Sequence, residues 1–166
     1  MDIQLLILDV DGTLTDGKLY YLKDGSDFKA FNAQDGLGLE CFLRLQKRVA
    51  IISGRKSESV LRRFEELNLS DCYLGVSDKL PVALDLIRKY SLKKEQVACV
   101  GDDLNDIPLF SACGLRFAPN NASALLKPFV DVILSRNGGD GAVREAVEYI
   151  LHKEGCVDKV LDYFRR

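Results

Sequence analysis

Residues 5–13 read Leu5-Leu6-Ile7-Leu8-Asp9-Val10-Asp11-Gly12-Thr13, an unbroken apolar run that ends in two aspartates and a glycine turn. A short continuous apolar run bounded by a turn signal predicts a strand that is covered on both faces. Asp9 and Asp11 are two residues apart, so on an extended chain their side chains point the same way. The sequence therefore predicts two carboxylates that share one site at the end of a buried strand.

The negative charge of two neighbouring carboxylates must be offset by a cation or by strong hydrogen-bond donors. Neighbouring carboxylates repel each other, and burial disfavours their charged form. A divalent cation is the simplest answer, and all-oxygen ligation favours Mg²⁺. Gly12 permits a sharp turn, and Thr13 offers a backbone N–H and a hydroxyl group to an anion. The alternative interpretation of these residues is a strand with an ordinary Asp-Gly turn.

The composition is that of a globular protein, since 47% of the 166 residues are apolar and 29% are charged. This length predicts one domain over residues 1–166. The net charge of −2, from 23 basic and 25 acidic residues, leaves no basic excess for nucleic acid. We expect no membrane contact, because no apolar run reaches spanning length and no basic leader is seen.

Cysteine usage favours the cytoplasm. The five cysteines are odd in number and form no Cys-x-x-Cys pair, which is typical of reduced, mostly buried thiols. They are Cys41, Cys72, Cys99, Cys113 and Cys156.

Strand and helix patterns alternate along the chain. The apolar runs of strand length are Leu5–Val10, Val49–Ser53, Cys72–Val76, Gln96–Val100, Leu115–Ala118 and Val130–Leu134. Helical periodicity appears between or after them in the sets Val60/Phe64/Leu67, Val82/Leu86/Ile87 and Val143/Val147/Ile150/Leu151. This alternation predicts an α/β fold, a doubly wound and mostly parallel Rossmann-like sheet with helices on both sides.

The segment Lys18 to Asn32 breaks this alternation. Two aromatic-rich stretches, residues 19–22 and 28–31, flank Asp24-Gly25, which is a β-hairpin signal. The hairpin follows the carboxylate motif directly, so it should stand as a flap beside the site. No insertion is long enough for a cap domain. The tail after Gly155 predicts a short amphipathic segment.

Polar groups follow the predicted strands at one rim of the sheet, where ligands bind in open parallel sheets. After the second, third and fourth strands come Ser53-Gly54-Arg55, then Lys79, then Gly101-Asp102-Asp103 with Asp106. Each has a plainer interpretation: Ser53 as a helix cap, Lys79 as a solvated lysine, the aspartates as a turn. Their joint placement favours a site for phosphate and metal.

These motifs, in this order, resemble the haloacid dehalogenase superfamily of phosphohydrolases. The resemblance implies that Asp9 is a nucleophile and that Asp11 is the general acid and base. It implies a Mg²⁺ site made by Asp9, Asp102 and the backbone carbonyl of Asp11, supported by Asp103 and Asp106. It implies phosphate binding by Thr13, Ser53, Gly54, Arg55 and Lys79.

Further motifs resemble a capless family of sugar-acid phosphatases of lipopolysaccharide synthesis. They are Leu14-Thr15-Asp16-Gly17, Phe31-Asn32 with Asp35-Gly36, residues 101–106, and Gly138-Gly139-Asp140-Gly141-Ala142-Val143-Arg144-Glu145. The resemblance implies a phosphorylated acidic eight-carbon sugar as substrate and a Mg²⁺-dependent homotetramer in which neighbouring subunits complete the site. Arg55 and Arg144 are candidates to meet substrate charge.

Two positions depart from that family: Gln34 stands where many relatives have arginine, and Asp140 is acidic. A nine-carbon sugar-acid phosphate of sialic-acid-type synthesis therefore stays open as substrate. Outside the enzymes, a phospho-acceptor receiver domain shares the sheet type and the acidic strand ends, and a non-catalytic scaffold is a third option. His152 lies far from every motif, which indicates a surface residue.

Overall fold

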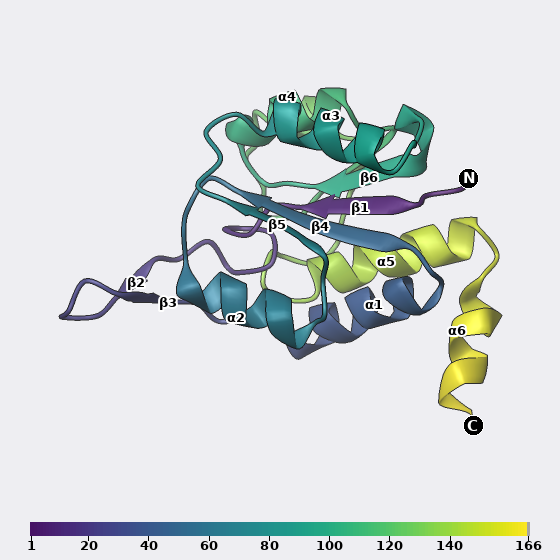
Figure 1. Ribbon diagram of the computed structural model, residues 1–166, viewed down its shortest axis with the longest axis horizontal. Helices are drawn as coiled ribbons and strands as arrows, with labels where there is room; N and C mark the ends of the chain where they lie inside the picture. The colour runs from purple at the N-terminus through teal and green to yellow at the C-terminus, as the bar shows by residue number, and fades with distance from the viewer. Residues whose placement is uncertain (166) are drawn as a thin grey trace.

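The computed structural model describes residues 1–165 and contains a six-stranded parallel sheet in the order β5-β4-β1-β6-β7-β8 (Figure 1). The strands are β1 (Leu5–Leu8), β4 (Arg48–Ser53), β5 (Asp71–Leu74), β6 (Val97–Val100), β7 (Leu115–Ala118) and β8 (Val132–Ile133). From β1 the chain winds outward through β4 and β5, then returns to build β6, β7 and β8 on the other side. The predicted doubly wound α/β sheet is confirmed.

Helices cover both faces of the sheet. The helices are α1 (Ala33–Arg44), α2 (Glu58–Glu66), α3 (Lys79–Lys89), α4 (Ile107–Ser111), α5 (Ala142–Lys153) and α6 (Val157–Phe164). Short 3₁₀ turns occupy Lys94–Gln96, Leu104–Asp106 and Lys127–Phe129. In Figure 1, α3 and α4 lie above the sheet, α1, α2 and α5 lie below it, and α6 packs beyond the end of α5.

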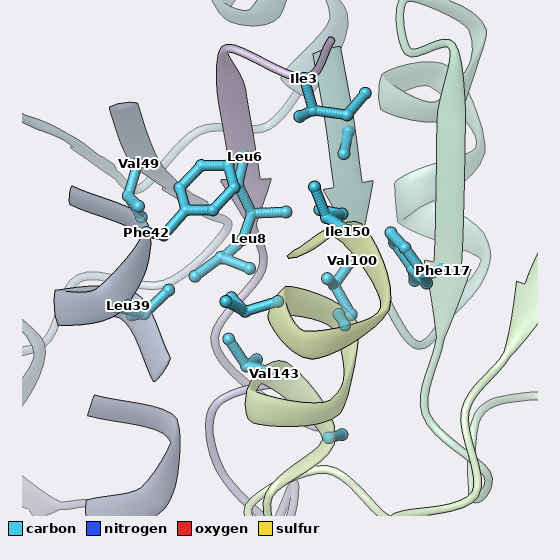
Figure 2. Close-up of a cluster of buried hydrophobic side chains, with 14 of the residues drawn as sticks. Ile3, Leu6, Leu8, Leu39, Phe42, Val49, Val100, Phe117, Val143 and Ile150 are labelled. Atoms are coloured by element: carbon cyan, nitrogen blue, oxygen red, sulfur yellow. The ribbon is translucent and has the colours of Figure 1, made fainter. Parts of the chain in front are cut away.

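Strand β1 shows why the sheet forms from this sequence. Leu6 and Leu8 face the layer of α1 and α5, where they pack with Phe42 and Ile150 (Figure 2). Residues 5 and 7 face the other layer, under α3 and α4. Because successive side chains of a strand point to opposite faces, a continuous apolar run fits a strand that is buried on both sides.

Helix α1 is an element that the periodicity does not predict. It begins after Asn32, whose side-chain oxygen accepts a hydrogen bond from the backbone N–H of Gln34 at 2.8 Å. Two glycines interrupt its apolar pattern, and both are explained by close packing. A Cβ on Gly36 would lie 2.2 Å from the guanidinium of Arg63, and one on Gly38 would lie 2.9 Å from Arg144.

Several predicted segments are longer than the elements that form. β1 ends at Leu8, so the paired aspartates begin the following turn. β5 runs from Asp71 to Leu74 and stops before Gly75, which has a positive φ of 72°. The last strand, β8, keeps two residues of the predicted five and pairs only with β7 among the described residues.

The predicted hairpin is present, with very short strands. β2 (Tyr20–Tyr21) and β3 (Asp27–Phe28) pair antiparallel, and the rings of Tyr20 and Phe28 stack with centroids 4.8 Å apart. The hairpin projects at the end of the sheet where β1 and β4 finish, and α6 lies toward the opposite end (Figure 1). It therefore stands at the rim to which the sequence assigns the site.

Two further expectations concern cysteines and membranes. All five cysteines are free thiols, as predicted. Within residues 1–165, no helix combines the length and the apolar character needed to cross a bilayer.

Asp71 ties the edge strand β5 to the end of α3. Its side chain is 1% exposed and accepts hydrogen bonds from Lys89 at 2.6 Å, from Ser70 at 3.1 Å and from the hydroxyl of Tyr90. Burial by itself raises the pKa of Asp71, but these donors outweigh it and hold that pKa below its usual value. The carboxylate is therefore a stabilising group in its ionised form.

We expect Asp71→Asn to lower the free energy of unfolding at neutral pH by about 2 kcal/mol, because charge-assisted hydrogen bonds are lost. A depressed pKa gives stability that is complete above the pKa of an unfolded aspartate, about 3.9, and that disappears as pH falls through the folded value. Urea unfolding of both proteins should therefore show a difference that shrinks in acid. A constant difference would contradict this role.

Candidate active site

A tight turn places Asp9 and Asp11 at the carboxyl end of β1. The carbonyl oxygen of Val10 accepts backbone N–H groups of Thr13, Leu14 and Thr15 at 2.9–3.2 Å. The expectation for Thr13 is therefore wrong in one part, because its N–H is used inside the turn and is not free for an anion. The Thr13 hydroxyl is buried and has no hydrogen-bond partner within the described chain.

Lys79 connects Asp9 to Asp106 beneath the rim. Its ammonium lies 2.5 Å from Asp9 Oδ1 and 2.6 Å from Asp106 Oδ1, and its side chain is 2% exposed. Burial alone would lower the pKa of Lys79, but the two carboxylates raise it above its usual value, so the lysine stays charged. The interpretation of Lys79 as a solvated lysine is wrong.

Asp106 shapes the loop that follows β6. Its Oδ2 accepts the backbone N–H groups of Asp102 at 3.0 Å and Asp103 at 3.4 Å. Gly101 is needed here, because a Cβ on it would lie 2.4 Å from Asp106 Oδ2. Asp103 is exposed, and its carboxylate accepts the N–H of Leu104 at the start of a 3₁₀ turn. Both oxygens of Asp106 are thus engaged by the protein.

The carboxylates around Asp9 fit a divalent cation. Oxygens of Asp9, Asp102 and Asp106 all lie within 4.8 Å of one another. Burial and neighbouring carboxylates raise the pKa of Asp9 to about 6, in spite of Lys79, and that of Asp102 to about 8. When all three carboxylates are ionised, as a bound cation favours, they and the one ammonium carry two net negative charges, which a divalent ion matches. Because both carboxylate oxygens of Asp106 already accept hydrogen bonds from the protein, Asp9 and Asp102 are the side chains available to hold Mg²⁺.

The Asp11 carboxylate is held on the hairpin side of the site. Oδ1 lies 2.5 Å from the ammonium of Lys29, and Oδ2 lies 3.8 Å from Nε of Arg55. Arg55 also donates to the hydroxyl of Tyr21 at 3.4 Å. Asp9 and Asp11 therefore share one rim but face different cations, which gives the two carboxylates different chemical environments.

These groups border a cavity of about 370 Å³ that opens at the end of the sheet. Its lining residues are Asp9, Asp11, Gly17, Leu19, Ser53, Gly54, Arg55, Asp102, Asp103 and Asn105. Ser53 ends β4, and its hydroxyl accepts the N–H of Arg55 at 3.3 Å. The N-cap position of α2 is Ser57, so the interpretation of Ser53 as a helix cap is wrong. The size suits a small-molecule ligand.

Sequence reasoning assigned no role to four residues in or beside this cavity. Gly17, Leu19 and Asn105 line the wall, and Lys29 reaches Asp11 from the hairpin. Gly17 and Asn105 lie within motifs of the sequence but had no role of their own there, and Leu19 is an apolar residue of the hairpin. For Lys29 the only available signal was the expected position of the hairpin beside the site.

The glycine-rich motif, residues 138–145, contacts the turn that carries Asp9 and Asp11. The N–H of Gly139 donates to the carbonyl oxygen of Thr13 at 3.1 Å. A Cβ on Gly138 would lie 1.8 Å from the carbonyl oxygen of Gly12, so the two backbones are in direct contact. Gly12 itself has a φ of 86° and faces Asp102, which would lie 2.0 Å from a Cβ there. Glycines thus let three loops meet around Asp9.

The remaining candidates lie outside the cavity. Arg144 pairs with Glu148 at 2.6 Å, and its backbone N–H donates to the buried Asp35 at 2.8 Å. Gln34 accepts from Arg136, which also donates to the carbonyl oxygen of Asp140. His152 is exposed on α5. In this chain, Arg144 does not reach the cavity, contrary to its candidacy for binding substrate.

Known proteins share this architecture. Residues 75–146 match the model of the haloacid dehalogenase-like hydrolases, and the parallel sheet flanked by helices agrees with that class of enzyme. The 3-deoxy-D-manno-octulosonate 8-phosphate phosphatase KdsC of Escherichia coli K12 is 44% identical over 158 residues, which are 95% of this chain and 84% of the relative. The chain belongs to the family of 3-deoxy-D-manno-octulosonate 8-phosphate phosphatases.

Solved structures agree in fold. The phosphatase of Moraxella catarrhalis, in complex with magnesium, phosphate and KDO, is 37% identical with a TM-score of 0.93 and covers 98% of this chain and 93% of its own. The cobalt-bound enzyme of Haemophilus influenzae is 40% identical with a TM-score of 0.90 and covers 93% and 90%. The chain is therefore a phosphatase, which sets aside the receiver-domain and scaffold interpretations.

We expect Gly138→Ala to lower kcat about 100-fold, because displacing the turn around Gly12 by about 1 Å misplaces the carboxylates. Gly155→Ala is the control: a Cβ on Gly155 has open space around it, but its φ of 64° strains any side chain there, so this variant can lower the melting temperature while it leaves kcat unchanged. Phosphate release and melting temperature should be measured for both variants. A folded Gly138→Ala protein with the activity of the wild type would show that this contact does not position the site.

Proposed function

We propose that the protein is a Mg²⁺-dependent phosphomonoester hydrolase that works through an aspartyl-phosphate on Asp9. One observation carries this proposal: a buried ammonium, that of Lys79, holds Asp9 at the floor of an open polar cavity. A carboxylate in this position can attack a phosphorus atom that enters from the cavity. Asp102 lies beside it as a second carboxylate for the cation.

In the first step, Asp9 attacks the phosphoryl group of the substrate. A bond forms between an Asp9 carboxylate oxygen and phosphorus while the bond from phosphorus to the leaving oxygen breaks. Lys79 fixes the orientation of Asp9 through Oδ1, which leaves Oδ2 for the reaction or the cation. When bound between Asp9 and Asp102, Mg²⁺ supplies positive charge that offsets the repulsion between carboxylate and phosphate.

Asp11 serves both halves of the reaction. As an acid it gives a proton to the leaving alcohol oxygen, and as a base it then takes a proton from the attacking water. The water oxygen bonds to phosphorus as the bond from phosphorus to the Asp9 oxygen breaks, so inorganic phosphate leaves, the Asp9 carboxylate is restored and Asp11 again holds a proton. Its carboxylate borders the cavity and is distinct from the three-carboxylate cluster. Asp9 and Asp11 can therefore perform different tasks although they stand two residues apart.

Ser53, Gly54 and Arg55 also line the cavity, and there we place the non-bridging oxygens of the phosphoryl group. A hydroxyl group, a backbone N–H and a guanidinium are suitable donors to these oxygens. Lys79 has no surface in the cavity and is 2% exposed, so its part is to orient Asp9 and to add positive charge from below.

The proposed substrate is 3-deoxy-D-manno-octulosonate 8-phosphate. The support is the family and the cavity, whose cationic wall residue, Arg55, suits an acidic sugar phosphate. The nine-carbon analogue is the second candidate, because one extra hydroxymethyl group is a small difference in an open site. We further propose action in the cytoplasm, in keeping with five free thiols. A homotetramer is proposed because the family resemblance implies one and because the hairpin exposes Tyr21, Leu22 and Phe28, which a neighbouring subunit could cover.

We expect the eight-carbon substrate to be preferred over simple sugar phosphates by about 10²-fold or more in kcat/KM, and over the nine-carbon substrate by a smaller factor. Phosphate release should be measured with Mg²⁺ and again with excess EDTA, which should abolish it. A preference for the nine-carbon sugar would support the proposed reaction and contradict the proposed substrate. The absence of metal-dependent release from every ester would contradict the proposed function.

Substitutions at the two aspartates separate their roles. Asp9→Asn should abolish turnover, since an amide cannot form the covalent intermediate. Asp11→Asn should slow turnover by about 10²- to 10⁴-fold, the usual contribution of general acid and base catalysis. Steady-state assays with the preferred ester test both. Substantial activity of Asp9→Asn at a purity that excludes wild-type enzyme would refute covalent catalysis.

A further inference from the structure

Lys29 is buried although it belongs to an exposed hairpin. Its side chain is 3% exposed, whereas the neighbouring residues Tyr21 and Phe28 are 65% and 46% exposed. Lysine is seldom buried unless it is paired, because a charge that leaves water needs compensation. The compensation here is Asp11, whose Oδ1 lies 2.5 Å from the ammonium, with Asp27 more distant at 3.8 Å.

Two cations, Lys29 and Arg55, lie against the Asp11 carboxylate, and Lys29 is the buried one of the two. Arg55 approaches the other carboxylate oxygen at 3.8 Å, but its side chain is 53% exposed and open to solvent. Among the described residues 1–165, Lys29 is thus the buried cation that is paired with Asp11. A charge-assisted hydrogen bond of this kind restricts the side-chain rotation of the carboxylate.

The pair also fixes the hairpin. Two strands of two residues each have little stability of their own in water. The stacked rings of Tyr20 and Phe28 hold the strands together, while Lys29 and the contact of Arg55 with Tyr21 attach them to the site. The orientation of Asp11 and the placement of the hairpin therefore depend on the same buried contact.

We propose that Lys29 is a positioning residue that aims the Asp11 carboxylate at the leaving oxygen of the substrate. This inference rests on the proposed function of Asp11 as acid and base. It predicts a selective defect when Lys29 is removed: Asp11 is still present but points in several directions. Displacement of a leaving group that needs its proton slows down, while substrate binding and displacement of a leaving group that needs no proton are preserved.

The leaving group makes this defect measurable. An alkyl phosphate such as 3-deoxy-D-manno-octulosonate 8-phosphate needs a proton on its leaving oxygen, whereas p-nitrophenyl phosphate releases a stable phenolate without one. For Lys29→Met we expect kcat/KM to fall about 100-fold for the sugar phosphate and less than about fivefold for the aryl phosphate. This parameter reports the steps up to release of the alcohol or phenolate.

Two variants serve as controls for Lys29→Met. Lys23→Met makes the same chemical change in the exposed turn of the same hairpin and should leave both substrates unaffected. Lys29→Arg keeps a cation and should retain more activity on the sugar phosphate than Lys29→Met. If Lys29→Met slows both substrates equally, Lys29 only holds the hairpin in place and the proposal is overturned.

A crystal structure of Lys29→Met gives a readout that does not depend on activity. We expect the Asp11 side chain to leave its present position or to occupy several rotamers. An Asp11 carboxylate that keeps its orientation without Lys29 would overturn the proposal, whatever the kinetics. Failure of the wild-type enzyme to hydrolyse any phosphate ester would instead refute the proposed function, and the crystal structures would still decide whether Lys29 orients Asp11.

Discussion

The buried ammonium of Lys79 is the interaction on which the rest of the site depends. It lies within 2.6 Å of both Asp9 and Asp106 and has almost no contact with solvent. Without it, two buried carboxylates would face each other with no cation from the protein, a severe penalty in a medium that solvates charge poorly. Lys79 begins α3, Asp9 follows β1 and Asp106 ends the turn after β6, so one charge joins three crossover units of the sheet. Removing the lysine should therefore disturb both Asp9, the proposed nucleophile, and the loop that presents Asp102.

A parallel sheet explains why these distant residues meet. β1 lies between β4 and β6. The chain first adds β4 and β5 on one side of β1 and later adds β6, β7 and β8 on the other, so the connections after β1 and β6 run in opposite directions and leave a crevice between them. Glycines at positions 12, 101 and 138 then allow the loops to approach more closely than any other residue would permit. The charge left over after Lys79 is satisfied is negative, which makes the crevice suitable for a divalent cation. The close approach of these loops thus brings together the carboxylates that would hold the cation.

Much of this arrangement follows from the sequence, and the exceptions have physical reasons. Strand ends in a parallel sheet share one rim, so the positions of Asp9, Ser53, Lys79 and Asp102 alone predict that they converge. Helix α1 was missed because Gly36 and Gly38, which serve close packing, interrupt its apolar pattern. Lys29 was missed because a lysine in an exposed hairpin has the sequence context of a solvated residue, and only the folded chain brings it to Asp11. The contact of the glycine-rich motif with the Asp9 turn likewise joins segments more than one hundred residues apart, beyond the reach of local patterns.

The central claim is that Asp9 becomes covalently phosphorylated, and direct detection of that intermediate is the most decisive measurement. The wild-type enzyme is mixed with its phosphate ester and Mg²⁺, quenched in acid within the first turnover, digested and mapped by mass spectrometry. The account predicts one phosphoryl group on the peptide that contains Asp9, at a level that rises and then decays as phosphate is released. Phosphorylation of another residue, or phosphate release in the first turnover with no phosphorylated peptide at any time, would contradict it.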